Sequence, residues 1–127
     1  MSKEYYYTKN KDGFMGSENR KVRKKKSETC EEKLRRMCKN IAEEITEGKK
    51  DPAIWMYDVY DVEWITHNDH SYKAARLMVA GNGPNIWVNT QDGTVDGYWG
   101  TDKVHWGFVD NIGLNDYLEE LHVHNTN

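Results

Sequence analysis

The stretch Ile86-Trp-Val-Asn-Thr-Gln-Asp-Gly-Thr-Val-Asp-Gly-Tyr-Trp99 decides the fold of this chain of 127 residues. Near its middle lies the dipeptide Asp92-Gly93, and a glycine there supplies the positive φ angle that tight hairpin turns need. The flanking residues are rich in β-branched and aromatic side chains, which favour strands. We therefore predict two antiparallel strands, over residues 86–90 and 94–99, joined by a turn.

Further strands are predicted on both sides of this hairpin. Alternating apolar and polar side chains indicate strands over residues 58–66, 72–80 and 104–109. Within the second of these, the alternation places Tyr72 and Leu77 on opposite faces. Turn-forming residues separate all the segments by short distances, which predicts an antiparallel meander.

A helix is predicted to begin at Thr29, because Thr29-x-x-Glu32 has the form of a capping box. A single apolar stripe follows at helical spacing and consists of Leu34, Met37, Cys38, Ile41, Ala42 and Ile45. Gly48 is suited to end the helix, and Pro52 prevents its continuation. Residues 53–57 are predicted to form a short helical turn.

A second helix is predicted to begin near Asn115, and residues 122–127 are expected to fray as a polar tail. The order of elements predicts an α+β domain, in which one face of an antiparallel sheet of four to five strands packs on the two helices. The predicted core consists of Leu34, Ile41, Ile45, Val62, Trp64, Leu77, Val79, Ile86, Val88, Leu118 and Leu121.

Charge divides the chain into two segments. Residues 1–26 contain nine Lys and Arg against three Asp and Glu, a net charge of +6, whereas residues 27–127 carry a net charge of −9. We predict a disordered basic arm over residues 1–26 and a single α+β domain over residues 27–127. The basic cluster of the arm, a candidate site for nucleic-acid phosphates with an acidic protein surface as the alternative, is Arg20, Lys21, Arg23, Lys24, Lys25 and Lys26.

The composition excludes a membrane-spanning helix, because no run of about 18 apolar residues is present. The N-terminus lacks the apolar segment that secretion requires, so we expect an intracellular protein. Cys30 and Cys38 are the only cysteines, and their spacing is too great for a disulfide within one helix. We expect two reduced thiols on an apolar face, with an intermolecular disulfide or a redox switch as the alternative.

No motif in the chain names a catalytic reaction. His67 and His70 bracket a predicted turn, which alone is weak evidence for a metal site. Asp61 and Glu63 share a strand face and, with a turn carboxylate, form a candidate Mg²⁺ site of a nuclease. Because no nucleophile arrangement or phosphate-binding loop accompanies them, the sequence favours a non-enzymatic protein that uses neither a metal nor a cofactor.

Tryptophan and tyrosine are concentrated in the predicted sheet. A domain of about 100 residues cannot fully bury five tryptophans and several tyrosines, and these side chains are the preferred anchors of binding interfaces. The residues predicted to form a protein interface combine aromatic rings with acidic side chains and are Asp92, Asp96, Tyr98, Trp99 and Asp102.

The runs Gly83-Pro-Asn-Ile-Trp-Val-Asn-Thr90 and Gly93-Thr-Val-Asp-Gly-Tyr-Trp-Gly100 resemble small proteins encoded by bacterial phages and conjugative elements. Their size and acidic α+β bodies are similar to those of anti-defence proteins, including anti-CRISPR inhibitors. The resemblance covers mainly residues 58–121, leaves out the basic arm and carries no catalytic residue. It implies a protein that acts in the cytoplasm of a bacterial host cell.

These features lead to three hypotheses about function. The first is a non-enzymatic inhibitor of a bacterial defence nuclease such as a Cas9-type effector, whose positively charged channel suits an acidic body and whose guide RNA or DNA suits a basic arm. The second is a stand-alone RNA- or DNA-binding regulator of a mobile element. The third is a metal-dependent nuclease. A homodimer is left open, and no membrane partner is expected.

Overall fold

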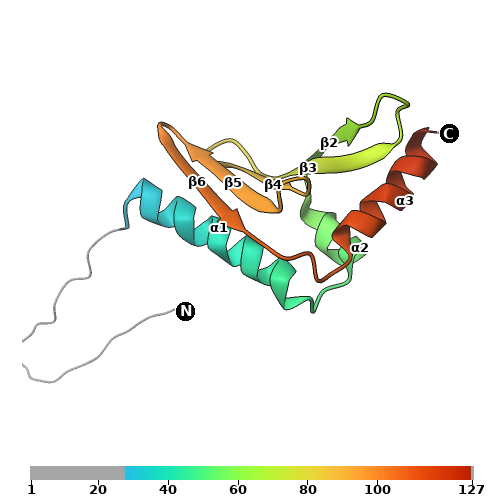
Figure 1. Ribbon diagram of the computed structural model, residues 1–127. Helices are drawn as coiled ribbons and strands as arrows, with labels where there is room; N and C mark the ends of the chain where they lie inside the picture. The colour runs from blue at the N-terminus through green and yellow to red at the C-terminus, as the bar shows by residue number, and fades with distance from the viewer. Residues whose placement is uncertain (1–27, 127) are drawn as a thin grey trace, which may run out of the picture.

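The computed structural model describes residues 28–126 (Figure 1). The helices, in chain order, are α1 (Cys30–Glu47), α2 (Pro52–Trp55), the 3-10 helix η1 (Met56–Asp58) and α3 (Leu114–Thr126). The strands are β2 (Asp61–Thr66), β3 (Tyr72–Ala80), β4 (Asn85–Asn89), β5 (Thr94–Trp99) and β6 (Asp102–Gly107).

The five strands form one antiparallel sheet in the order β2-β3-β4-β5-β6. This order confirms the predicted meander and the α+β class. The strand β5 has the predicted bounds, and β4 lies one residue earlier than predicted. The first strand begins three residues later than predicted, because η1 occupies the preceding segment. The helical turn predicted for residues 53–57 is present as α2 and η1.

All described helices lie on one face of the sheet (Figure 1). The helix α1 packs against β5 and β6, whereas α3 packs against β3 and touches α2. The side chains that are fully buried between the two layers are Leu34, Cys38, Ile45, Leu77, Ile86, Val88, Val95, Leu114 and Leu118. Within residues 28–126, no element covers the opposite face of the sheet.

The helix α1 begins and ends as its sequence predicts. The Thr29 hydroxyl accepts a hydrogen bond from the Glu32 backbone N–H at 3.1 Å, and the Glu32 carboxylate accepts one from the Thr29 N–H at 2.9 Å. These bonds satisfy two backbone donors that the first helical turn leaves free. Gly48 follows the helix with a φ of 72°, a left-handed conformation that glycine adopts at little cost.

Gly97 of β5 sets how closely α1 approaches the sheet. A Cβ atom at this position would lie 2.5 Å from Cys38 Sγ and 2.8 Å from Leu34 Cδ1. Both distances are shorter than a van der Waals contact, which is about 3.5–4.0 Å between carbon atoms. The glycine is therefore required by the close packing of helix on strand.

The predicted core is confirmed at its centre and is wrong at its margin. Five of the predicted core residues are only partly buried: Ile41, Val62, Trp64, Val79 and Leu121. Val62 and Trp64 belong to the edge strand β2, which has a neighbour on one side only. Cys30 is exposed whereas Cys38 is buried, so one of the two thiols lies outside the apolar face predicted for both.

A bulge between β2 and β3 turns Tyr72 toward the helices, which corrects the predicted alternation. Trp64 pairs with Ala75, but after a shift in register Thr66 pairs with Tyr72. One extra residue in a strand moves the following side chain to the other face of the sheet. Tyr72 consequently meets Trp64, with ring centroids 6.1 Å apart.

The C-terminal helix continues further than predicted. It extends to Thr126, and His122, which was expected in a fraying tail, is only 5% exposed. The His122 ring packs edge-on against Trp64, with centroids 5.0 Å apart. At the other end of α3, the Asp110 carboxylate accepts hydrogen bonds from the Leu114 and Asn115 N–H groups, both at 2.8 Å.

Candidate functional site

The face of the sheet turned away from the helices carries a row of large and polar side chains. Val88 and Val95 are buried in the core, so strand alternation places their neighbours Trp87 and Asp96 on the other face. The strand register puts Trp87 beside Asp96 and Asp96 beside His105. The side chains that define this surface, called the open face below, are Arg76, Trp87, Asp96, Tyr98 and His105.

The Arg76 guanidinium group lies over the Trp87 ring on the open face. The guanidinium carbon is 4.4 Å from the centroid of the Trp87 ring, a cation–π contact. On another side, Arg76 Nη1 lies 2.6 Å from Glu63 Oε1, and the Arg76 side chain is 32% exposed. The two contacts hold the Arg76 side chain between the Trp87 ring and the Glu63 carboxylate.

Asp96 is 7% exposed, which is uncommon for a carboxylate. Its Oδ1 atom lies 2.8 Å from His105 Nδ1, where a ring N–H donates to the carboxylate. The bond compensates for the burial of a charged group and orients the exposed imidazole. The His105 ring also meets Tyr98 edge-on, with centroids 6.2 Å apart.

The five residues predicted to form a protein interface do not lie together. Asp96 and Tyr98 belong to the open face. Trp99 lies on the helix side of β5, where Lys33 Nζ is 5.6 Å from its ring centroid. Asp102 pairs with Trp99 at the start of β6, and Asp92 lies in the turn at the far end of the β4–β5 hairpin.

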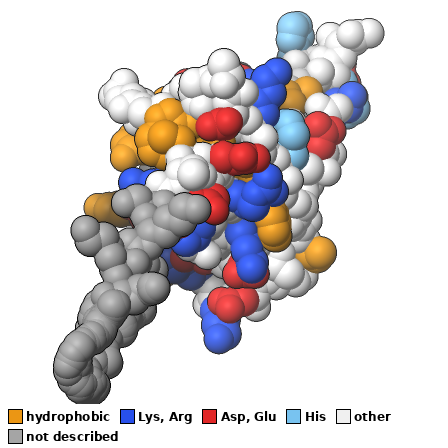
Figure 2. All heavy atoms as spheres, turned by 90° about the vertical axis from the view of Figure 1, so that its left-hand side faces the viewer, with side chains coloured by type: hydrophobic (Ala, Val, Ile, Leu, Met, Phe, Trp, Pro, Cys, Tyr) orange, Lys and Arg blue, Asp and Glu red, His pale blue; other side chains and the backbone are white. Residues whose placement is uncertain are grey.

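The negative charge of the body lies outside α1. Residues 28–50 contain six basic and six acidic side chains, whereas residues 51–126 contain three basic and twelve acidic ones, a net charge of −9. On α1 opposite charges pair, as between Arg35 and Glu31 at 3.2 Å. Figure 2, which shows the side where α1 begins, has basic and acidic side chains interspersed. The predicted acidic surface is therefore confined to the segments after α1.

Among residues 28–126, the most exposed large apolar side chains lie just before β2, and they were missed in the predicted interface. Ile54, Tyr57 and Tyr60 are 64%, 90% and 73% exposed. Tyr60 was expected on the apolar face of a strand, but β2 begins after it. The sequence signal that marks this segment is the repeated pair Tyr57-Asp58 and Tyr60-Asp61, in which an aspartate directly follows each tyrosine.

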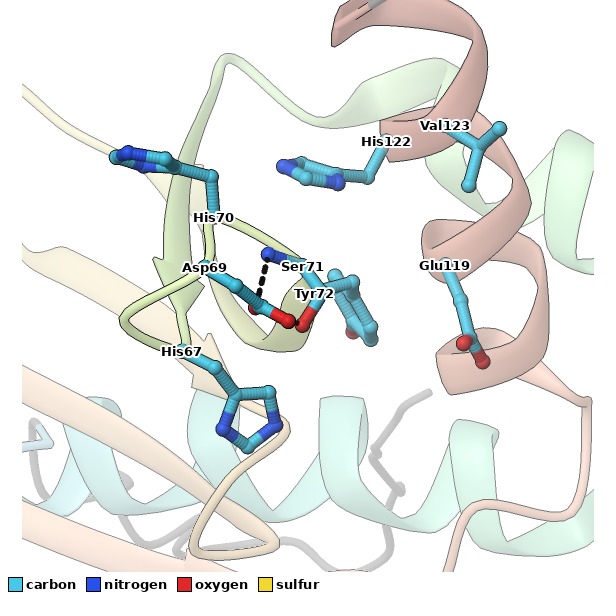
Figure 3. A pocket seen from close by; sticks show the side chains of 8 residues that line it. All are labelled: His67, Asp69, His70, Ser71, Tyr72, Glu119, His122 and Val123. Carbon is cyan, nitrogen blue, oxygen red and sulfur yellow. Dashed lines mark hydrogen bonds between the residues drawn. The ribbon is translucent and has the colours of Figure 1, made fainter.

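An open hollow of about 480 Å³ lies between the β2–β3 turn and α3 (Figure 3). It is lined by His67, Asp69, His70, Ser71, Tyr72, Glu119, His122 and Val123. Asp69 Oδ1 accepts hydrogen bonds from the Ser71 hydroxyl at 2.6 Å and the Ser71 N–H at 3.0 Å. These bonds lower the pKa of Asp69 and hold the turn in shape.

Polar contacts continue on the α3 side of the hollow. The Tyr72 hydroxyl donates to Asn115 Oδ1 at 2.7 Å, and burial raises the pKa of Tyr72. His122 projects from α3 toward the turn, whereas His67, which also lines the hollow, extends away from His122 (Figure 3). Within residues 28–126, no group of three or more His, Cys, Asp or Glu side chains is arranged to hold a metal ion.

The two carboxylates considered for a nuclease are engaged elsewhere. Glu63 is paired with Arg76, and Asp61 Oδ1 accepts a hydrogen bond from the Val62 N–H at 2.9 Å. The predicted nucleic-acid cluster, from Arg20 to Lys26, lies outside the described residues. In the part of the chain that the structure covers, no helix has both the length and the apolar character needed to cross a membrane.

Comparison with protein-family models, with curated protein sequences and with solved structures finds no match to this chain. What the protein does is therefore inferred from its own residues.

Proposed function

We propose that this protein is a non-enzymatic inhibitor of a bacterial nucleic-acid-targeting nuclease, of the anti-CRISPR type, that acts in the cytoplasm of a host cell. The body docks on the effector protein, for which a Cas9-type nuclease is the example, and the basic arm engages its guide RNA or DNA. The observation that carries the proposal is the open face, where ordered aromatic and charged side chains lie on a sheet surface that no described element covers.

The composition of the open face favours contact with a protein. Tryptophan, tyrosine and arginine are the side chains enriched at interface hot spots, and Trp87, Tyr98 and Arg76 lie on this one surface. Arg76 is held by two partners and His105 by Asp96. Side chains ordered before binding lose less conformational entropy when a partner docks.

Net charge supports a basic surface as the partner of the body. Residues 51–126 carry a net charge of −9, and RNA-guided nucleases hold their heteroduplex in a positively charged channel. Charge complementarity of this kind accelerates docking and selects the partner. The same charge repels nucleic acid, so any contact with RNA or DNA is assigned to the arm.

A stand-alone RNA- or DNA-binding regulator is the second candidate, and the basic cluster of the arm is the observation that favours it. This candidate predicts tight nucleic-acid binding in the absence of any protein partner. A nuclease has less support, because Glu63 is paired with Arg76 and the described residues contain no arranged metal-binding group.

A pull-down tests the proposal. Tagged full-length protein is recovered from bacterial cells that express a Cas9-type effector, with and without its guide RNA. Recovery of the effector only with its guide supports an inhibitor that recognises the ribonucleoprotein. Recovery of RNA alone supports the regulator, and recovery of neither contradicts both candidates.

Variants separate the contributions of body and arm. Trp87→Ala combined with Tyr98→Ala removes the aromatic anchors of the open face and should reduce recovery of the effector. The control Tyr117→Ala removes another half-buried tyrosine, from α3, and should not reduce it. Replacement of the five basic residues of the arm by alanine should weaken RNA binding and flatten its salt dependence; these are Lys21, Arg23, Lys24, Lys25 and Lys26.

A further inference from the structure

The segment that joins α1 to β2 carries an exposed apolar patch that shares no residue with the open face and is formed by Ile54, Tyr57 and Tyr60. These side chains are 64%, 90% and 73% exposed. Ile54 and Tyr57 are three residues apart across α2 and η1, a spacing that puts two side chains on the same side of a helical turn. Single exposed apolar residues are ordinary, but three large ones within seven residues of the chain form a candidate contact surface.

The backbone beneath the patch is ordered by its own contacts. Asp51 Oδ2 accepts a hydrogen bond from the Ala53 N–H at 3.2 Å and caps α2. The Tyr60 N–H donates to the Met78 carbonyl at 2.8 Å and ties the end of the segment to β3. Trp55 is 6% exposed and anchors α2 in the core. The exposed side chains therefore project from an ordered backbone, which lowers the entropic cost of binding.

The chain segment that carries the patch is acidic. Residues 51–61 contain Asp51, Asp58 and Asp61 but no Lys or Arg. Among the ion pairs formed within residues 28–126, none includes any of these three aspartates. The nearby Lys50 forms an ion pair with Glu44, with Nζ and Oε2 2.6 Å apart, and interacts more weakly with the charge of Asp58. Apolar side chains within an acidic rim call for a positively charged partner.

Half of the basic cluster of the same molecule lies too close to α1 in the sequence to supply that charge. The helix α1 has 18 residues, so it separates Thr29 from α2 by roughly 27 Å. Lys24 precedes Thr29 by five residues, which span at most about 18 Å even when fully extended. Lys24, Lys25 and Lys26 therefore cannot reach the patch, whereas Arg20, nine residues before Thr29, spans up to about 32 Å. The occupant that we argue for, from the charge of the patch, is a separate protein.

We propose that Ile54, Tyr57 and Tyr60, with Asp58 and Asp61 at their rim, bind an arginine-rich protein surface. A guanidinium group pairs with carboxylates and also stacks on tyrosine rings, whereas the lysine ammonium group is a compact, strongly hydrated charge. The patch thus selects arginine over lysine. This inference does not depend on the partner of the open face, and it holds for any Arg-rich surface of matching shape.

The probes are oligo-arginine and oligo-lysine peptides of equal length, titrated at low salt into the full-length protein while backbone amide resonances are followed by NMR. The expected result is tighter binding of oligo-arginine, with shifts concentrated in residues 51–61. Equal affinity for the two peptides, or shifts centred on the acidic residues of α3, overturns the proposal.

Matched variants assign the selectivity to the patch. Tyr57→Leu combined with Tyr60→Leu keeps apolar surface but removes the rings, and should reduce the affinity for oligo-arginine to that for oligo-lysine. Asp58→Asn combined with Asp61→Asn should lower the affinity for both peptides by about three- to fivefold.

Two further measurements complete the test. The control Glu119→Gln with Glu120→Gln removes the same charge from exposed positions of α3 and should leave the shifts in residues 51–61 unchanged. Loss of those shifts in the control contradicts the proposal. Self-association seen by sedimentation, and abolished by the tyrosine variant, identifies a second copy of this chain as the occupant and likewise overturns it.

Discussion

The two main helices meet the sheet in different ways. In the α1 half, where α1 covers β5 and β6, Leu34 and Cys38 lie directly against Gly97. In the α3 half, where α3 lies on β3, the rings of Trp64, Tyr72 and His122 fill the space, with centroids 5.0–6.1 Å apart. A helix that packs closely on a strand requires a residue without a side chain, such as Gly97, at the point of contact. Aromatic rings between a helix and the sheet instead act as spacers.

The difference in packing is also a difference in chemistry. The centre of the α1 half is apolar, and its charges lie on the outer surface of the helix, where they pair. The α3 half combines rings with titratable groups, and the hollow lined by His70 and His122 lies beside them. Tyrosine has a polar tip that finds a hydrogen-bond partner when buried, as Tyr72 does at Asn115, so polar groups belong to this half.

The largest expected contrast is between the two thiols of α1. Burial, with a smaller contribution from the Asp96 charge, raises the pKa of Cys38 from 9.0 to about 11, whereas Cys30 is exposed. Because the thiolate is the reactive form, this rise alone lowers the reactivity of Cys38 about a hundredfold at neutral pH. Thiol-exchange labelling of the native protein should therefore modify Cys30 first.

The control for this prediction is Cys30→Ser, which should remove the fast phase of labelling and leave the slow one. Equal labelling rates for the two thiols would show that the α1 half opens readily, and would break the contrast with the α3 half.

Unfolding at alkaline pH allows the stability of the two halves to be compared directly. Burial raises the pKa of Cys38 in the α1 half and of Tyr72 in the α3 half. When folding raises the pKa of a group, the folded protein keeps a proton that the unfolded chain releases. The contribution of that group to the free energy of unfolding is therefore complete below its pKa in the unfolded chain, and it is lost as the pH rises through its pKa in the folded protein. Loss should begin near pH 9.0 for Cys38 and near pH 10.0 for Tyr72.

Urea unfolding at a series of pH values measures these two contributions. The difference in free energy of unfolding between wild type and Cys38→Ala should shrink as pH rises above 9.0, and the difference between wild type and Tyr72→Phe should shrink only at higher pH. Differences that stay constant over this range would show that neither group is protected by folding.

A methyl group at Gly97 tests how tightly the α1 half is packed. Gly97→Ala should lower the free energy of unfolding by about 1–3 kcal/mol, the usual cost of overpacking. Gly83→Ala is the matched control, because a Cβ atom there meets nothing within 4 Å and Gly83 has no positive φ. Chemical denaturation of both variants gives the comparison; equal stabilities would mean that α1 can move away from β5 at no cost.

The helix starts give the smallest expected contrast. Asp110 satisfies two N–H groups of α3 with its carboxylate, whereas the Thr29 hydroxyl satisfies one of α1. Loss of a capping side chain costs about 0.5–2 kcal/mol, so Asp110→Ala should lie near the top of this range and Thr29→Ala near its lower end. Thermal unfolding ranks the two variants, and the reverse order would show that α1 depends more on its cap than α3 does.

Local signals were sufficient to predict the elements that form through nearby contacts. The capping box at Thr29, the apolar stripe of α1 and the turn at Asp92-Gly93 each involve residues a few positions apart. The prediction failed where a bulge changed the register, as at Tyr72, and where a partner from another element decided burial, as Trp64 does for His122.

The candidate site was predictable only within one strand. Asp96 and Tyr98 are two residues apart on β5, so alternation alone placed them on one face. Trp87 and His105 join them through the register of neighbouring strands, and Arg76 joins through its contact with Trp87. Asp92 and Trp99 were grouped with them by proximity in sequence, which does not imply a shared surface.

The amino-acid pattern was enough to establish an α+β chain with its helices, its meander and its division of charge, because hydrogen-bonded turns, periodicity and net charge depend on composition and near neighbours. The tertiary structure decided that Gly97 receives a helix, that Asp96 is buried beside His105, and that Tyr57 and Tyr60 remain exposed. These properties depend on which distant residues share a space, and that is settled only when helices and strands pack together.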